Sequence, residues 1–373
     1  MFAALALTGN PSSVHAEGRR LRAIIEAARD EVAALLNAQP SEVVFTSGAS
    51  EANVMALGSR WDTVMMAGIE HESVLAPVRA SGTRLVDVPV APSGVVDCGT
   101  IAAHVPKRAP GHRTALALQL ANNETGVIQP VAEVAAFARD HGVAIHTDAV
   151  QAAGRISIDF AALGVDTLSL SAHKIGGPKG TGALIIRDGF EVPVLIRGGG
   201  QERRRRAGTE NVAAIAGFGA AARVAARELA GMPRMAAMRD RLERGLLQAT
   251  PNAVVFGREA RRLPNTCCIG VPGRSAVIVV IKLDLAGFAV SAGSACSSGK
   301  VGASHVLAAM GADAAAAKGA IRISLGRETT DAEIDTFVRA WRDIHGVTAP
   351  RELETRHFET SVSAFEAAPA IGD

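Results

Sequence analysis

The chain has 373 residues, a formal net charge of +2 and 48% hydrophobic residues. Its charges are spread along the sequence, which excludes a nucleic-acid-binding surface built on one basic cluster. The densest apolar run, residues 276–285, is too short to span a bilayer and contains Lys282, so we expect no membrane partner.

The start of the chain and its cysteines indicate the compartment. Residues 1–7 are apolar but carry no basic leader and no convincing cleavage site, so we expect no signal peptide. The cysteines show neither metal-ligand spacing nor a disulfide framework; they are Cys98, Cys267, Cys268 and Cys296. The sequence therefore predicts a cytoplasmic protein without a metal site.

The N-terminal region predicts a helix, a strand and a turn that suits a phosphate. Ser12 or Ser13 can cap a helix that runs to about Asn37 with apolar residues at helical spacing. Residues 43–45 predict a short buried strand, and residues 46–53 predict a turn into the next helix. Such a turn leaves backbone N–H groups available to a phosphate, although helix capping explains its serines equally well.

Strand-like and helix-like segments then alternate, a rhythm that predicts a mostly parallel sheet covered by helices. Ligands of such sheets bind at the carboxyl ends of the strands. Polar residues follow four predicted strands at that position, namely His71, residues 122–126, Asp148 with Gln151, and residues 171–174. A lone histidine or aspartate is more often a satisfied cap, but four such ends together predict one site.

The segment 166–186 contains Lys174, the residue on which the chemical prediction depends. It reads as a strand, a polar turn, a glycine-rich loop and a second strand. An amine placed there among dipoles can become a nucleophile toward carbonyl groups. The alternative is a surface lysine in a hairpin, but of the six lysines only Lys174 has a strand and polar neighbours before it.

A new pattern begins near Gly231 and predicts a second domain, as the length of the chain also does. The elements expected there are helices at 235–249, 275–285 and 331–344, an apolar stretch through Cys267 and Cys268, and strands at 288–290 and 321–325. We predict a large domain over residues 1–230 and a smaller C-terminal α+β domain over residues 231–373, whose tail from about residue 350 is loosely ordered.

Cys296 lies in a run of small residues, 291–299. The small neighbours give the backbone freedom and deny the thiol an apolar environment, whereas Cys267 and Cys268 lie in an apolar strand and are expected in the core. A thiol with a pKa of about 8.5 is mostly protonated at pH 7, so an attacking cysteine needs a cationic or hydrogen-bonding neighbour. The run predicts a reactive cysteine on a movable loop.

Nine stretches carry a resemblance to a known family. They read, in order, FTSGASEAN, EHESV, NNETG, HTDAVQAAG, SLSAHKIGGPKGTGAL, GGGQER, RAGTEN, SAGSACSSG and IRISLGRETT. They resemble the cysteine desulfurases of the iron–sulfur-cluster type, pyridoxal phosphate-dependent enzymes of the class V aminotransferase superfamily. The resemblance implies an α/β, aspartate aminotransferase-like transferase fold, with a mostly parallel mixed sheet in the large domain.

The resemblance assigns the ring of the cofactor, pyridoxal 5'-phosphate, to four residues. It implies that Lys174 binds the cofactor covalently and that Asp148 keeps the pyridine nitrogen protonated. Gln151 would hydrogen-bond the phenolic oxygen, and His71 would stack on the ring and shuttle protons.

The resemblance also assigns the phosphate and the substrate. The implied phosphate contacts are Ala49, Ser50, Ser171, His173 and, from the second subunit of a homodimer, Thr209. Asn123 would contact cofactor or substrate, and Arg322 would bind the substrate carboxylate through its guanidinium.

The implied reaction converts L-cysteine to L-alanine. Cys296, as a thiolate, would attack the substrate sulfur and pass the resulting persulfide sulfur to an acceptor or iron–sulfur scaffold protein. Two alternatives stay open: another class V enzyme, such as a selenocysteine lyase or an aminotransferase, and a catalytically silent cofactor-binding partner. The second rests on the start of the chain, because family members usually carry a segment with an Asp-x-x-Ala-Thr-Thr-like motif ahead of residues 9–11.

Overall fold

The computed structural model describes residues 1–58, 60–107, 109–293 and 304–346. The predicted loose tail and Cys296 lie outside these ranges. No helix within them is long and apolar enough to cross a membrane.

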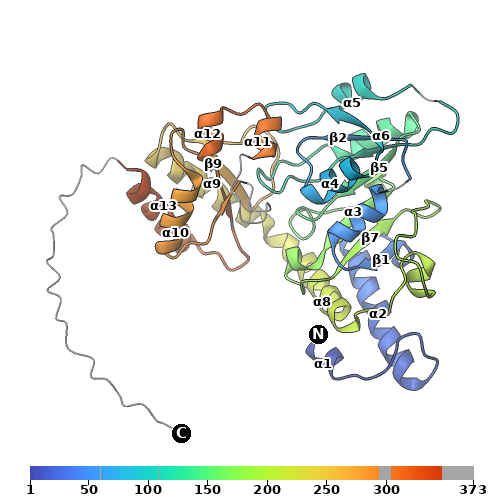
Figure 1. Ribbon diagram of the computed structural model, residues 1–373. Coiled ribbons are helices and arrows are strands. Elements are labelled where there is room, and N and C mark those ends of the chain that lie inside the picture. Colours follow the sequence, from blue (N-terminus) through green and yellow to red (C-terminus); the bar gives the residue numbers. More distant parts are fainter. Residues whose placement is uncertain (59, 108, 294–303, 347–373) are drawn as a thin grey trace, which may run out of the picture.

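A seven-stranded sheet forms the larger part of the molecule (Figure 1). Its strands are β1 (Val43–Thr46), β2 (Thr63–Ala67), β3 (Arg84–Val88), β4 (Thr114–Ala117), β5 (Ala144–Asp148), β6 (Thr167–Ser171) and β7 (Gly182–Ile186), in the spatial order β1-β7-β6-β5-β4-β2-β3. Neighbouring strands from β3 to β6 run parallel, and only β7 runs against both of its neighbours. The expected mostly parallel mixed sheet is confirmed.

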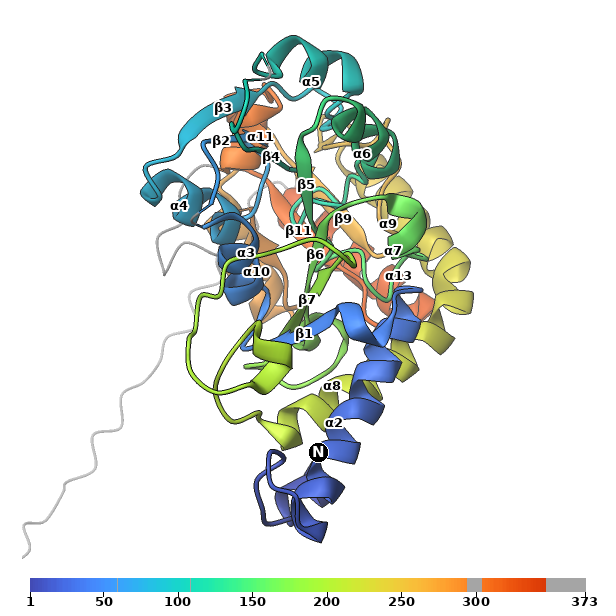
Figure 2. The same cartoon turned by 90° about the vertical axis from the view of Figure 1, so that its right-hand side faces the viewer.

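Helices cover both faces of this sheet, so its strands are apolar on both sides. The helices of this part of the molecule are α1 (Phe2–Leu5), α2 (Ala16–Leu35), α3 (Ala49–Leu57), α4 (Glu72–Ala80), α5 (Cys98–His104), α6 (Val131–Asp140), α7 (Phe160–Leu163) and α8 (Val212–Glu228). Figure 2 shows α3 and α4 on one side and α6 and α7 on the other. Successive residues of a strand point to opposite faces of the sheet. In β1, Phe45 packs in the core that includes residues of α2 and α6, and Val44 packs in the core that includes residues of α3 and α4.

The helix α2 begins later than predicted, because the serines expected to cap it belong to a preceding turn. Ser12 N donates to Asn10 Oδ1 and Ser13 N donates to Asn10 O, both at 2.9 Å. His15 caps the helix instead, and its Nδ1 accepts from Gly18 N at 3.2 Å.

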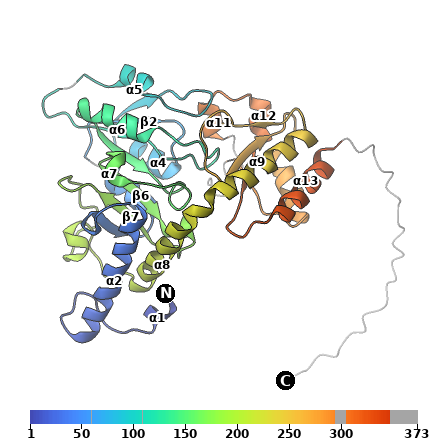
Figure 3. The same ribbon diagram turned by 180° about the vertical axis from the view of Figure 1, so that it is seen from behind.

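A four-stranded antiparallel sheet forms the other part of the molecule, with its own core around Trp341. Its elements are β8 (Val254–Val255), β9 (Thr266–Gly270), β10 (Ser291–Ala292), β11 (Ile321–Ser324), α9 (Met232–Ala249), α10 (Ala276–Leu285), α11 (His305–Ala309), α12 (Ala314–Lys318) and α13 (Asp331–His345). Short 3-10 turns occur at η1 (Pro40–Glu42), η2 (Ala172–Ile175), η3 (Gln201–Arg204) and η4 (Leu229–Gly231). Through η4, the helices α8 and α9 form one long connection between the two sheets (Figure 3).

The strand predicted at residues 288–290 is wrong by a few positions. Phe288 N donates to Leu283 O at 2.9 Å and so closes the end of α10, while the Phe288 ring packs edge-on against Phe337. The strand β10 therefore starts only at Ser291, which lies opposite Arg322 on β11.

Candidate active site

A cavity of about 500 Å³ lies at the carboxyl ends of β5 and β6. The predicted site residues that line it are Ala49, Ser50, His71, Asn123, Asp148, Gln151, Ser171, His173, Lys174 and Arg322. Thr209 does not line it and is exposed in the segment before α8. Cys296 lies outside the described residues.

Asp148, the last residue of β5, places a buried carboxylate in this cavity. Its Oδ1 accepts from Val150 N at 2.9 Å, and its Oδ2 accepts from Asn53 Nδ2 at 3.1 Å. Burial raises the pKa of Asp148, and these hydrogen bonds oppose the rise. A cationic group that enters the cavity would therefore find a carboxylate held in one orientation.

His71 follows β2 and caps α4 with its own ring. Its Nδ1 accepts from Ser73 N at 3.1 Å and lies 2.8 Å from Ser73 Oγ. Burial is the largest influence on this histidine and lowers its pKa. A neutral ring whose Nδ1 accepts carries its proton on Nε2.

Lys174 stands on η2, directly after β6, and shares the cavity with Asp148 and His71. Burial has the larger effect on both neighbours; the positive charge of Lys174 adds to the lowering of the His71 pKa and opposes the rise of the Asp148 pKa. The backbone carbonyl of Lys174 accepts from the Arg155 guanidinium at 3.2 Å, and the turn ends at Gly176 with a φ of 86°. The turn thus holds the lysine backbone at the edge of the sheet.

The start of α3 forms the end of the cavity that suits an anion. Ala49 and Ser50 lie in the first turn of this nine-residue helix, whose free N–H groups and dipole favour negative charge. Across the cavity, Ser171 Oγ lies 2.8 Å from His173 Nδ1. The backbone at this end is close-packed, because a Cβ on Gly182 would lie 2.7 Å from the Cα of Gly48.

Arg322 brings the second sheet to the cavity. From β11 its NH1 donates to Asn123 O at 2.8 Å and its NH2 to Ser291 Oγ at 3.3 Å. The side-chain Oδ1 of Asn123 is buried without a hydrogen-bond partner among the described residues, so a ligand donor could satisfy it. One wall of the cavity therefore comes from each sheet.

Glu70, which sequence reasoning did not single out although it stands in the EHESV stretch, lies buried beside the site. Its Oε1 accepts from Gln119 N at 2.8 Å, and its Oε2 has no partner in the part of the chain that the structure describes. Burial raises the pKa of Glu70 to about 8, so the carboxyl stays protonated at neutral pH.

Glu70→Gln is expected to flatten the pH dependence of stability. Between pH 4.5 and about 8 the folded protein keeps a proton on Glu70 that the unfolded chain loses. The free energy of unfolding of the wild type therefore falls with rising pH in this window, by about 1.4 kcal/mol per pH unit from this group. Glutamine cannot ionise, so urea unfolding of the variant at pH 5.5, 6.5 and 7.5 should lack this slope. The exposed change Glu133→Gln is the control, and an equal slope in Glu70→Gln would contradict a protonated Glu70.

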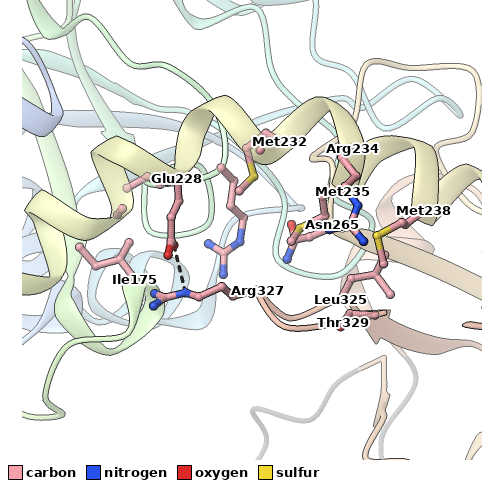
Figure 4. A pocket seen from close by; sticks show the side chains of 15 residues that line it. Ile175, Glu228, Met232, Arg234, Met235, Met238, Asn265, Leu325, Arg327 and Thr329 are labelled. Carbon is pink, nitrogen blue, oxygen red and sulfur yellow. Dashed lines mark ion pairs between the residues drawn. The ribbon is translucent and has the colours of Figure 1, made fainter. Parts of the chain in front are cut away.

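A second cavity, of about 290 Å³, lies against the α8–α9 connection (Figure 4). Arg327 pairs there with Glu228 at 3.0 Å, and Met232, Met235 and Met238 supply apolar surface. It contains none of the predicted site residues. Arg155 lines this second cavity and donates to the backbone carbonyl of Lys174, a residue of the first cavity.

Known proteins resemble this chain over most of its length. Residues 4–337 match the family described as Aminotransferase class-V. A cysteine desulfurase of Bradyrhizobium diazoefficiens is 44% identical over 345 residues, which cover 90% of this chain and 87% of that protein. A cysteine desulfurase of Gluconacetobacter diazotrophicus is 43% identical over 340 residues, which cover 88% and 84%. The X-ray structure of a NifS-like protein from Rickettsia africae superposes with a TM-score of 0.84 at 33% identity, covering 93% of this chain and 94% of that one.

Proposed function

The chain belongs to the class V aminotransferase family and is a cysteine desulfurase, and we propose that it acts on L-cysteine with pyridoxal phosphate in the cavity at β5 and β6. The observation that carries this proposal is the meeting of Lys174, Asp148 and Arg322 in one cavity. An amine, a buried carboxylate and a guanidinium are what covalent binding, a pyridine nitrogen and an amino-acid carboxylate require.

The donor set of the cavity fits the cofactor. The start of α3 with Ser171 and His173 can bind the phosphate, and Thr209 of a second subunit would complete this subsite in a homodimer. When bound, pyridoxal phosphate supplies an aromatic ring that accepts electrons from a deprotonated substrate carbon.

The residues of the chain then orient the reactants and move protons. With the cofactor bound, Asp148 would keep a proton on the pyridine nitrogen, and Gln151 would donate to the phenolic oxygen. Lys174 Nζ takes the proton from Cα of L-cysteine, and His71, with its proton on Nε2, assists proton transfer at the substrate.

Cys296 is the proposed acceptor of the substrate sulfur. Gly293, the last described residue before it, lies so close to Glu124 that a Cβ there would be 3.2 Å from Glu124 Oε2. Glu124 is the neighbour of Asn123, which lines the cavity. Cys296 follows Gly293 by three residues, which span at most about 11 Å when fully extended. The sulfur would then leave as a persulfide for an acceptor protein or a reducing thiol.

Arg322→Lys is expected to raise the KM for L-cysteine about tenfold while lowering kcat less. Lysine keeps the charge but loses the two-pronged contact with a carboxylate. Steady-state alanine formation over a range of L-cysteine concentrations measures both constants. Arg327→Lys, which affects an arginine of the second cavity, is the matched control. An unchanged KM in Arg322→Lys would show that the carboxylate binds elsewhere.

The experiment that tests the function is the yield of alanine and sulfide from L-cysteine under a reducing thiol. A desulfurase gives both in equal amounts. Formation of 3-mercaptopyruvate without sulfide would indicate an aminotransferase. Much faster turnover of L-selenocysteine, offered as a second substrate, would indicate a selenocysteine lyase, and no product from cofactor-loaded protein would indicate a silent partner. Each of these three outcomes overturns the proposal.

A further inference from the structure

A buried chain of hydrogen bonds lies beneath the cavity and centres on Asn53 of α3. Asn53 is only 1% exposed and does not line the cavity. Its Nδ2 donates to Asp148 Oδ2 at 3.1 Å and to Ser73 Oγ at 2.9 Å. Its Oδ1 lies 3.0 Å from His146 Nε2. One amide therefore joins three polar side chains.

The direction of each hydrogen bond follows from the carboxylate. An ionised Asp148 only accepts, so the NH2 group of Asn53 must face it and the amide oxygen must face His146. His146 Nε2 then carries a proton, and His146 Nδ1 accepts from Thr167 Oγ1 at 2.9 Å. Burial lowers the pKa of His146 to about 3, which keeps the ring neutral with one donor and one acceptor.

The second branch leads to His71. Ser73 Oγ accepts from Asn53, so its own hydrogen is available to His71 Nδ1 at 2.8 Å. The same Nδ1 accepts from Ser73 N. Both contacts require an unprotonated Nδ1 and leave the proton of His71 on Nε2. A reversed Asn53 amide would set its oxygen against the Asp148 carboxylate and remove its donation to Ser73.

We infer that Asn53 is a positioning residue that connects the Asp148 carboxylate, through Ser73, to the His71 imidazole. We further infer that His146 and Thr167 hold the Asn53 amide in the one orientation that donates to both Asp148 and Ser73. The consequence for cofactor binding rests on the proposed function. The hydrogen-bond directions do not, because they follow from contacts within the chain.

The first test measures the directions in protein without cofactor. Long-range ¹H–¹⁵N spectra of histidine-labelled protein, assigned with His71→Gln and His146→Gln, report which ring nitrogen carries the proton. We expect the Nε2–H form for both histidines near neutral pH. An Nδ1–H form at either position would overturn the inference, whatever the protein catalyses and whether or not any Asn53 variant folds.

The second test uses Asn53→Leu, which keeps the size of the side chain but cannot donate. Without the Asn53 donor the pKa of Asp148 rises, so the carboxylate forms only at higher pH. We expect the affinity for the cofactor near pH 6.5, measured by absorbance titration, to fall about tenfold. The loss of affinity on acidification should also begin at a higher pH than in the wild type. The matched control is Gln129→Leu, which removes another buried amide, one that contacts Gly94 and Val96.

The outcomes separate this inference from the proposed function. If the wild type binds no pyridoxal phosphate, the proposed function fails and the spectra alone decide the hydrogen-bond directions. If the wild type binds pyridoxal phosphate, and Asn53→Leu binds it with the same affinity and the same pH dependence as Gln129→Leu, the positioning role of Asn53 is wrong.

Discussion

Replacement of Lys174 by alanine lowers the rate of alanine formation from L-cysteine on the order of 10⁴-fold or more, the largest loss that we expect from any single change. The residue combines two proposed tasks, covalent binding of the cofactor and removal of the Cα proton. The turn η2 places Lys174 in the cavity together with Asp148 and His71, directly after the strand β6. Product assays and borohydride trapping of the covalent cofactor measure the two losses separately.

Lys179→Ala is the control for this result. Lys179 lines the same cavity but lies in the exposed loop before β7. We expect it to keep the trapped cofactor and most of the activity, since a loss of positive charge near the phosphate affects binding only modestly. Trapping that survives in Lys174→Ala and disappears in Lys179→Ala would move the nucleophile to Lys179.

Replacement of Cys296 by serine is expected to lower sulfide release on the order of 10³-fold while the protein still binds L-cysteine. A hydroxyl is a far weaker nucleophile than a thiolate toward sulfur. The other cysteines are poor substitutes, because burial raises the pKa of the Cys267 and Cys268 thiols and also raises that of Cys98. The measurements are sulfide release under dithiothreitol and the spectral change on addition of L-cysteine.

Cys98→Ser provides the comparison for this variant. Cys98 begins α5 and does not line the cavity, so its loss should leave the yield of sulfide unchanged. Sulfide release that persists in Cys296→Ser would support a lyase that does not use an enzyme thiol.

The sequence best predicted those features that depend on residues close together in the chain. Polar residues at strand ends predicted the shared position of His71, Asp148 and Lys174, because parallel strands end at one edge of a sheet. The phosphate end was visible in the turn before α3, although there the pattern alone could not separate anion binding from capping.

Contacts between distant segments were beyond the reach of such patterns. Asn53 reads as one more polar residue near a helix start, and only the packing of α3 against β5 shows that it meets Asp148 and His146. The pKa of Glu70 depends in the same way on burial that no short motif reveals. The late start of α2 is due to a turn at Asn10, and the late start of β10 is due to the end of α10, which Phe288 closes. These hydrogen bonds outweigh the helix and strand propensities of the residues involved.

The hydrogen bond between Arg322 and the Asn123 carbonyl links the choice of substrate to the junction of the two sheets. The guanidinium proposed to select an amino-acid substrate also makes a hydrogen bond between β11 of the small sheet and the loop that follows β4 of the large sheet. A substitution that widens the cavity for a different substrate would therefore also loosen the junction of the two sheets. Evolution of a new specificity at this position would require a second change elsewhere along the junction to restore rigidity.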